Sequence, residues 1–90
     1  MVKIKIPTPL RRFTNEQSEI EIESSSIKEL IEVIGQKYPD LKKRLCDEEG
    51  NIRKFINVYV GEEDIRFLKG LDTEIKNEDE VNIVPAISGG

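Results

Sequence analysis

The run Phe55-Ile-Asn-Val-Tyr-Val60 decides the fold, because it is the most strand-like stretch of the 90-residue chain. Apolar β-branched residues occupy every second position, as expected for a strand with one buried face. The residues predicted to face the core are Ile56, Val58 and Val60. Those predicted to face outward are Phe55, Asn57 and Tyr59. The rest of the chain must therefore cover one side of this strand.

Downstream of this run, the sequence predicts short strands joined by turns. Residues 61–64 form a turn and residues 65–67 a brief strand. A connection then runs to the polar residues 77–80. Residues 81–84, Val-Asn-Ile-Val, form the last strand, and Pro85 ends it.

Upstream of it, the spacing of apolar residues predicts a helix that begins after Ser26. Ser26 and Glu29 have the spacing of a capping box, in which each side chain satisfies a free backbone N–H. One apolar stripe follows, at Ile27, Leu30, Ile31 and Ile34. Tyr38-Pro39 ends the helix, because the residue before a proline avoids helical angles. Residues 39–46 predict a short second helix with Leu41 and Leu45 facing inward.

The first 23 residues predict a β-hairpin with a long connection. Residues 2–6 and 19–23 both alternate apolar with charged residues. Antiparallel pairing would set the lysines of the first strand opposite the glutamates of the second, which is favourable. Residues 7–18 contain two prolines and many polar residues, so we expect a loop there; loops of this length are often functional.

The predicted order is therefore strand, strand, helix, strand, short strand, strand, which is an α+β architecture. We expect a mixed sheet of four to five strands with one main helix packed across it. First and last strands side by side in the middle would give the β-grasp arrangement of ubiquitin-like proteins. Residues 1–84 would form this domain, and residues 85–90 a flexible C-terminal tail ending in Gly-Gly.

Composition narrows the functions that such a domain can have. Fourteen basic against eighteen acidic residues give a net charge of −4, so we expect no nucleic-acid partner. The chain has no histidine and one cysteine, which excludes histidine-based triads, Cys/His zinc sites and an internal disulfide. No signal peptide or membrane-length apolar run is visible, so we expect a cytoplasmic protein without a membrane partner.

Three internal features are weak functional candidates. Cys46 has no histidine base, and the acidic residues that follow it would raise its pKa, so a half-buried structural role is favoured. The acidic runs 47–49, 62–64 and 78–80 sit at predicted turns and lack the spacing of a calcium loop, so we expect no metal. Arg11 and Arg12, in the long loop, are candidates for contact with an anionic partner.

The end of the chain is a stronger candidate. Glycine has no Cβ, so Gly89-Gly90 can thread a channel that is too narrow for any side chain. The six residues from Pro85 to Gly90 span roughly 20 Å when extended. The terminal carboxylate would then be the reactive group farthest from the folded domain. A carboxylate becomes a good electrophile once adenylation by ATP has made its oxygen a leaving group.

The C-terminal motif resembles that of a known family. Residues 55–90, and above all the ending Asp79-Glu-Val-Asn-Ile-Val-Pro-Ala-Ile-Ser-Gly-Gly90, resemble the MoaD/ThiS family of ubiquitin-like sulfur carriers. The beginning, Ile4-Lys-Ile-Pro-Thr-Pro-Leu-Arg-Arg-Phe-Thr14, together with Asn57-Val-Tyr-Val60, looks closest to the CysO branch, which serves cysteine biosynthesis. The resemblance spans the chain and is looser in the helix.

This resemblance implies a cycle of reactions at Gly90. An E1-like activating enzyme of the MoeB/ThiF type would use ATP to adenylate the carboxylate, and a sulfur donor would displace AMP to leave a thiocarboxylate. The residues expected to thread into each partner are Ala86, Ile87, Ser88 and Gly89. The acceptor would be a cysteine synthase acting on an activated serine derivative. The chain would then be a co-substrate and no enzyme, with no cofactor of its own.

Docking would also need a surface on the domain. The outward face of the sheet is the candidate, with Phe55, Tyr59 and Val84, by analogy with other ubiquitin-like folds. Arg11 and Arg12 would lie near the root of the tail if the first and last strands are adjacent, where they would steer acidic partners.

Three other functions stay open from the sequence. A small subunit of molybdopterin synthase would share the tail chemistry and differ in its partner, the large subunit of that enzyme. A ubiquitin-like protein modifier would join Gly90 to a lysine. A plain interaction domain would not use its glycines at all.

Overall fold

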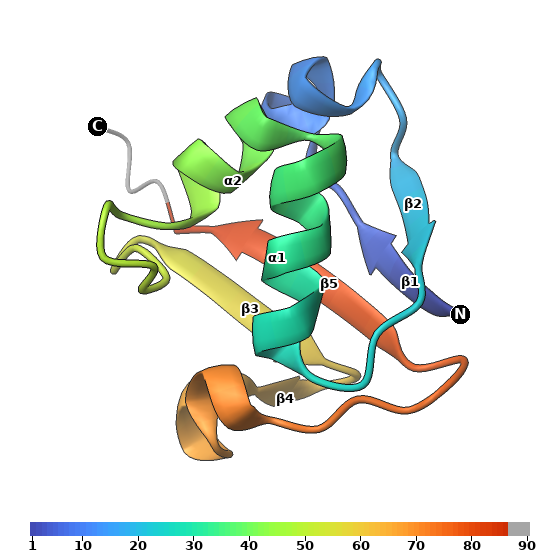
Figure 1. Cartoon of the computed structure of the whole chain (residues 1–90), viewed down its shortest axis with the longest axis vertical. Coiled ribbons are helices and arrows are strands. Elements are labelled where there is room, and N and C mark those ends of the chain that lie inside the picture. Colours follow the sequence, from blue (N-terminus) through green and yellow to red (C-terminus); the bar gives the residue numbers. More distant parts are fainter. Residues whose placement is uncertain (87–90) are drawn as a thin grey trace.

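A five-stranded mixed sheet forms the centre of the protein, as a computed structural model of residues 1–86 shows (Figure 1). The strand order across the sheet is β2-β1-β5-β3-β4. β5 runs parallel to β1, and the other pairs are antiparallel. The strands are β1 (Val2–Lys5), β2 (Glu19–Ile22), β3 (Ile56–Val60), β4 (Glu63–Asp64) and β5 (Glu80–Pro85). The predicted α+β sheet, with its first and last strands adjacent, is confirmed.

The N-terminal hairpin has the predicted register. Lys3 lies opposite Glu21, and Lys5 lies opposite Glu19. The Lys5 Nζ donates to Glu19 Oε1 at 2.6 Å. This hydrogen bond raises the pKa of Lys5 and lowers the pKa of Glu19. The edge strand β2 is thus joined to β1 through side chains as well as through the backbone.

Two helices cover one face of the sheet (Figure 1). α1 (Ile27–Lys37) begins at the predicted cap, where the Glu29 N–H donates to Ser26 Oγ at 3.2 Å. The reciprocal half of the capping box differs, because Glu29 Oε1 accepts from the Ser25 N–H at 2.8 Å. The second predicted helix is confirmed as α2 (Pro39–Leu45).

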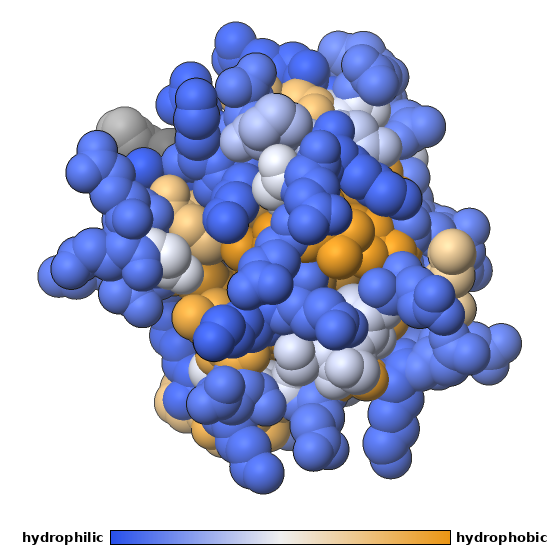
Figure 2. Space-filling model, viewed as in Figure 1, coloured by the Kyte–Doolittle hydropathy of each residue, from blue (hydrophilic) through white to orange (hydrophobic). Residues whose placement is uncertain are grey.

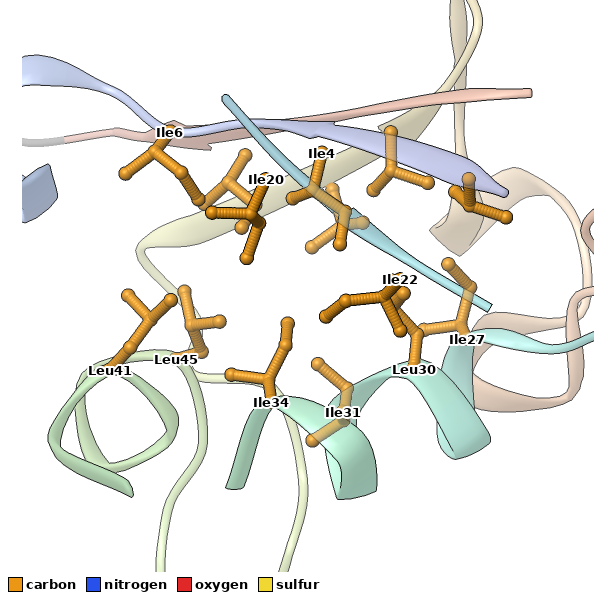
Figure 3. Packing of buried hydrophobic residues seen from close by; sticks show 14 of the residues in the cluster. Ile4, Ile6, Ile20, Ile22, Ile27, Leu30, Ile31, Ile34, Leu41 and Leu45 are labelled. Atoms are coloured by element: carbon orange, nitrogen blue, oxygen red, sulfur yellow. The ribbon is translucent and has the colours of Figure 1, made fainter. Parts of the chain in front are cut away.

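The core lies between these helices and the sheet. Figure 3 shows Ile4, Ile6 and Ile20 above the side chains that the helices supply. The whole predicted stripe of α1 is buried, as are Leu41 and Leu45 of α2. In β3 the predicted core residues Ile56 and Val58 are buried, whereas Val60 packs against the edge of the core and is half-buried.

Two segments differ from the prediction. Residues 65–67 were predicted as a strand but form a 3₁₀ helix, and the short strand is β4, just before them. The Asp64 carboxylate accepts from the Arg66 N–H at 2.8 Å, which caps a helical turn and ends the strand. The predicted loop 7–18 contains another 3₁₀ helix, Thr8–Thr14, which buries Leu10 and Thr14.

The surface is mostly hydrophilic on the face that carries the helices (Figure 2). Within residues 1–86, no helix combines the length and the apolar character that crossing a bilayer requires.

Candidate functional site

β5 is the element that leads to the predicted tail. Residues 80–82 of β5 pair with β1, and residues 81–85 pair with β3. β5 reaches one residue beyond the predicted end, because Pro85 still opposes Ile56. The next residue, Ala86, donates its N–H to the Phe55 carbonyl at 2.6 Å. In this register the nitrogen of Pro85 points away from β3, so its missing N–H costs no hydrogen bond to that strand.

The predicted reactive end falls outside the described residues. Of the residues expected to enter a partner, Ala86 is exposed and anchored by its N–H. Ile87, Ser88, Gly89 and Gly90 lie beyond the described part of the chain, and their roles stay predictions.

An arginine fixes the backbone on which Ala86 depends. The Arg66 guanidinium donates to the carbonyls of Lys54 and Ile56, both at 2.9 Å. It also donates to Asn57 Oδ1 at 2.7 Å. These bonds tie the start of β3 to the 3₁₀ turn at residues 65–67. Arg66 therefore binds the backbone carbonyls of the residues on either side of Phe55. The Phe55 carbonyl itself accepts the hydrogen bond from the Ala86 N–H.

The three predicted surface residues do not share one environment. Val84 is 44% exposed and lies opposite Asn57, and Tyr59 is half-buried on the same outward face. Phe55 is 50% exposed and precedes β3, where it lines a groove together with Pro85. The predicted patch is thus divided between the sheet face and the end of the sheet.

The two loop arginines also separate. Arg11 donates its Nε–H to the Ile6 carbonyl at 3.0 Å and lines a hollow with Lys5 and Asn82. Arg12 is exposed and lines the same groove as Phe55 and Pro85. Arg12 is therefore the one that lies at the root of the tail, and Arg11 supports the end of β1.

Sequence reasoning missed other residues of this groove. Phe13, Arg44 and Arg53 line it, and they come from three separate segments. Arg12 and Arg44 lie over the Phe13 ring, with guanidinium carbons 5.6 and 5.3 Å from its centroid. The basic clusters 11–12 and 42–44 were the available signal, but only the fold brings them together.

Cys46 is more deeply buried than predicted. It is 3% exposed and belongs to the core cluster. Burial is the largest cause of its raised pKa, and the nearby Asp47 contributes less than the prediction assumed. A neutral, buried thiol suits a structural residue.

The acidic runs have structural contacts in their turns. Asp47 Oδ1 accepts the N–H groups of Glu49 and Asn51, at 2.9 and 3.0 Å. Asp79 Oδ2 accepts the Lys76 N–H at 2.8 Å. Over residues 1–86, no three acidic, histidine or cysteine side chains gather as a metal site would require.

Comparison with known proteins gives the family. Residues 4–90 match the ThiS family. The sulfur carrier protein CysO of Mycobacterium tuberculosis is 36% identical over 99% of this chain and 98% of its own. CysO in the crystal structure of the Amycolatopsis orientalis BexX/CysO complex is 39% identical, with a TM-score of 0.92 and full coverage of both chains. The solution structure of small archaeal modifier protein 1 from Methanosarcina acetivorans is 30% identical, with a TM-score of 0.83, over 99% of this chain and 95% of its own.

Residues 1–86 share the fold of these relatives, and the Mycobacterium tuberculosis relative is named as a sulfur carrier protein. The five-stranded sheet, its central last strand and the match through residue 90 therefore lead to one conclusion: this chain belongs to the ThiS family and is a ubiquitin-like sulfur carrier.

Proposed function

We propose that Gly90 carries the sulfur, as a thiocarboxylate, and that it supplies cysteine biosynthesis. The observation that carries this proposal is that the family match continues through residue 90, directly after a central strand that is anchored as far as Ala86. The similarity to CysO proteins favours cysteine formation over the molybdopterin pathway.

The proposed chemistry proceeds in two balanced steps. A terminal carboxylate oxygen attacks the α-phosphorus of ATP in an E1-like enzyme, and pyrophosphate leaves. A sulfide ion then attacks the acyl carbon, and AMP leaves with the oxygen that the phosphorus had activated. The carrier contributes position, because a docked tail raises the effective concentration of its sulfur in the acceptor's site. ATP belongs to the activating enzyme, and the carrier holds no cofactor.

Intact-mass analysis tests the proposal. The protein is incubated with its cognate E1-like enzyme, magnesium ATP and sulfide. We expect its mass to rise by the difference between one sulfur and one oxygen atom, and only when ATP is present. Deletion of Gly90 should abolish the change, whereas Cys46→Ala should leave it intact. An increase equal to a whole sulfur atom, lost with Cys46→Ala, would instead locate the sulfur on the thiol.

A second function has one observation in its favour. The similar Methanosarcina acetivorans protein is called a small archaeal modifier protein. If this chain also modifies proteins, cells that express a tagged form should contain tagged species of higher mass. Those species should disappear when Gly90 is deleted, and their absence from wild-type cells would argue against a modifier role.

A further inference from the structure

A groove of about 420 Å³ opens beside Pro85, and the proposed chemistry does not use it. Its walls come from the 3₁₀ helix Thr8–Thr14, from α2, and from the facing ends of β3 and β5. Buried Leu10 and Ile56 line it, together with the rings of Phe13 and Phe55. It is therefore an apolar trough between elements that are far apart in the sequence.

The groove has a strongly positive rim. Arg12, Lys43, Arg44 and Arg53 line it, and no acidic residue does. Asp40 lies nearby, in a smaller hollow that also touches Phe13, Lys43 and Arg44. Within residues 1–86 the only ion pair is Lys5–Glu19, so none of these four cations forms an ion pair with a described carboxylate. Such a concentration of positive charge is unexpected in a chain with a net charge of −4.

The cations are also held in place for binding. Arg12 and Arg44 stack near the Phe13 ring, which keeps their planar guanidinium groups beside the trough. Arg53 donates its Nε–H to the Lys43 carbonyl at 3.2 Å, which fixes a third cation against α2. Guanidinium groups in fixed positions suit carboxylates, which accept two parallel N–H bonds.

We propose that this groove binds an acidic protein segment that carries one large apolar side chain, and that the segment belongs to the enzyme that activates the C-terminus. The proposal rests on the proposed function for its partner. Pro85 lines the groove, so an enzyme that takes up the residues after Ala86 approaches the domain beside it. The apolar side chain fills the trough between the phenylalanine rings, and flanking carboxylates pair with the arginines. The net charge of −4 opposes the binding of a nucleic-acid backbone.

The test compares two charge-matched double variants of the full chain. Arg12→Gln/Arg44→Gln removes the two stacked guanidinium groups. Lys28→Gln/Lys37→Gln removes the same charge from exposed positions on α1. We expect the arginine variant to raise the KM of the activating enzyme for the carrier about tenfold with kcat unchanged, and to weaken its dependence on salt. The lysine variant should retain the wild-type KM. Amide spectra of both variants establish that they are folded.

A probe peptide tests the groove without any enzyme. In titrations followed by amide shifts, the blocked hexapeptide Asp-Glu-Phe-Leu-Glu-Asp should perturb residues 12–13, 43–44 and 53–55. A control peptide in which Asn replaces each Asp and Gln replaces each Glu should leave these amides unchanged. The proposal is overturned if both peptides act alike or if a single-stranded oligonucleotide binds there instead. It is also overturned if the acidic peptide binds only after deletion of residues 87–90, which would mean that the chain's own end occupies the groove.

The two proposals fail in different ways. A wild-type KM for the arginine variant, with normal thiocarboxylate formation, overturns the groove and leaves the role of Gly90 intact. Selective peptide binding without any thiocarboxylate on the wild-type protein overturns the role of Gly90 and leaves an acidic-segment site.

Discussion

The two halves of β5 differ in how firmly the sheet holds them. Residues 80–82 lie between β1 and β3, and the Gly61 N–H reaches the Glu80 carbonyl at 2.8 Å. Residues 83–85 pair with β3 alone. Residues 80–82 thus have a hydrogen-bonded neighbour on both sides, whereas residues 83–85 have one on a single side. The doubly paired half of β5 therefore lies in the middle of the sheet, and a singly paired half connects it to the residues that are proposed to work outside the domain.

The largest expected effect on stability comes from replacing a valine by alanine, and it should differ between the two halves of β5. Val81 is fully buried, and Val84 is 44% exposed. Val81→Ala should lower the free energy of unfolding by about 2 kcal/mol, because it removes buried methyl groups and leaves a cavity. Val84→Ala should change it by less than about 0.5 kcal/mol. Urea denaturation measures both. Equal losses would mean that the two halves are held alike.

A second prediction concerns the arginine that fixes the start of β3. Arg66→Gln should lower the free energy of unfolding by about 1 kcal/mol, because it removes hydrogen bonds from an exposed guanidinium to two backbone carbonyls. Hydrogen exchange of the Ala86 amide should accelerate more than that of Val81. Uniform acceleration along β5 would contradict a local role for Arg66 at the root of the tail.

Cys46 provides a test that separates stability from function. Cys46→Ala should lower the free energy of unfolding by about 1 kcal/mol, because the thiol belongs to the core. Sulfur transfer should be unaffected. Because burial raises the pKa of the thiol, alkylation by iodoacetamide in the native protein should be slower than in urea at the same pH. Rapid alkylation without urea would mean that this thiol is accessible.

The smallest expected effect is a pH dependence of the free energy of unfolding, caused by the Lys5–Glu19 pair between β1 and β2. The pKa of Glu19 is lowered in the folded protein, so its contribution is present above the unfolded pKa and lost as the pH falls through the folded pKa. The pKa of Lys5 is raised, so its contribution is lost as the pH rises through the folded value. Glu19→Gln should slightly flatten the acid limb of a stability–pH profile. A steeper limb would contradict this assignment.

The sequence predicted those parts of the fold that depend on local chemistry. Alternation at residues 2–6 and 56–60, and the cap at Ser26, decide strands and a helix within a few residues. Residues 65–67 were misassigned because a branched apolar residue and an aromatic residue on either side of a charged one are typical of a strand. Their conformation is instead fixed by the Asp64 cap and by the hydrogen bonds of the Arg66 guanidinium to Ile56 and Asn57 of β3.

The candidate site was also only partly predictable from the sequence. The glycines at the end of the chain were visible as a motif. The adjacency of the first and last strands was predicted by analogy with ubiquitin-like folds, because the order of elements alone left other α+β folds open. The groove could not be predicted, because Arg12, Arg44 and Arg53 meet only through the packing of the 3₁₀ helix on α2 and the turn before β3. Long-range packing of this kind leaves no periodic signal in the sequence.

Delivery of sulfur by a chain extended with one alanine after Gly90 tests the central claim most directly. The wild-type and extended proteins are each incubated with the activating enzyme, magnesium ATP, sulfide and the acceptor enzyme with its activated serine substrate, and the cysteine formed is measured. We predict that the wild-type chain supports cysteine formation and that the extended chain, folded equally well, does not. Equal rates from both proteins would contradict the claim that the terminal carboxylate of Gly90 carries the sulfur.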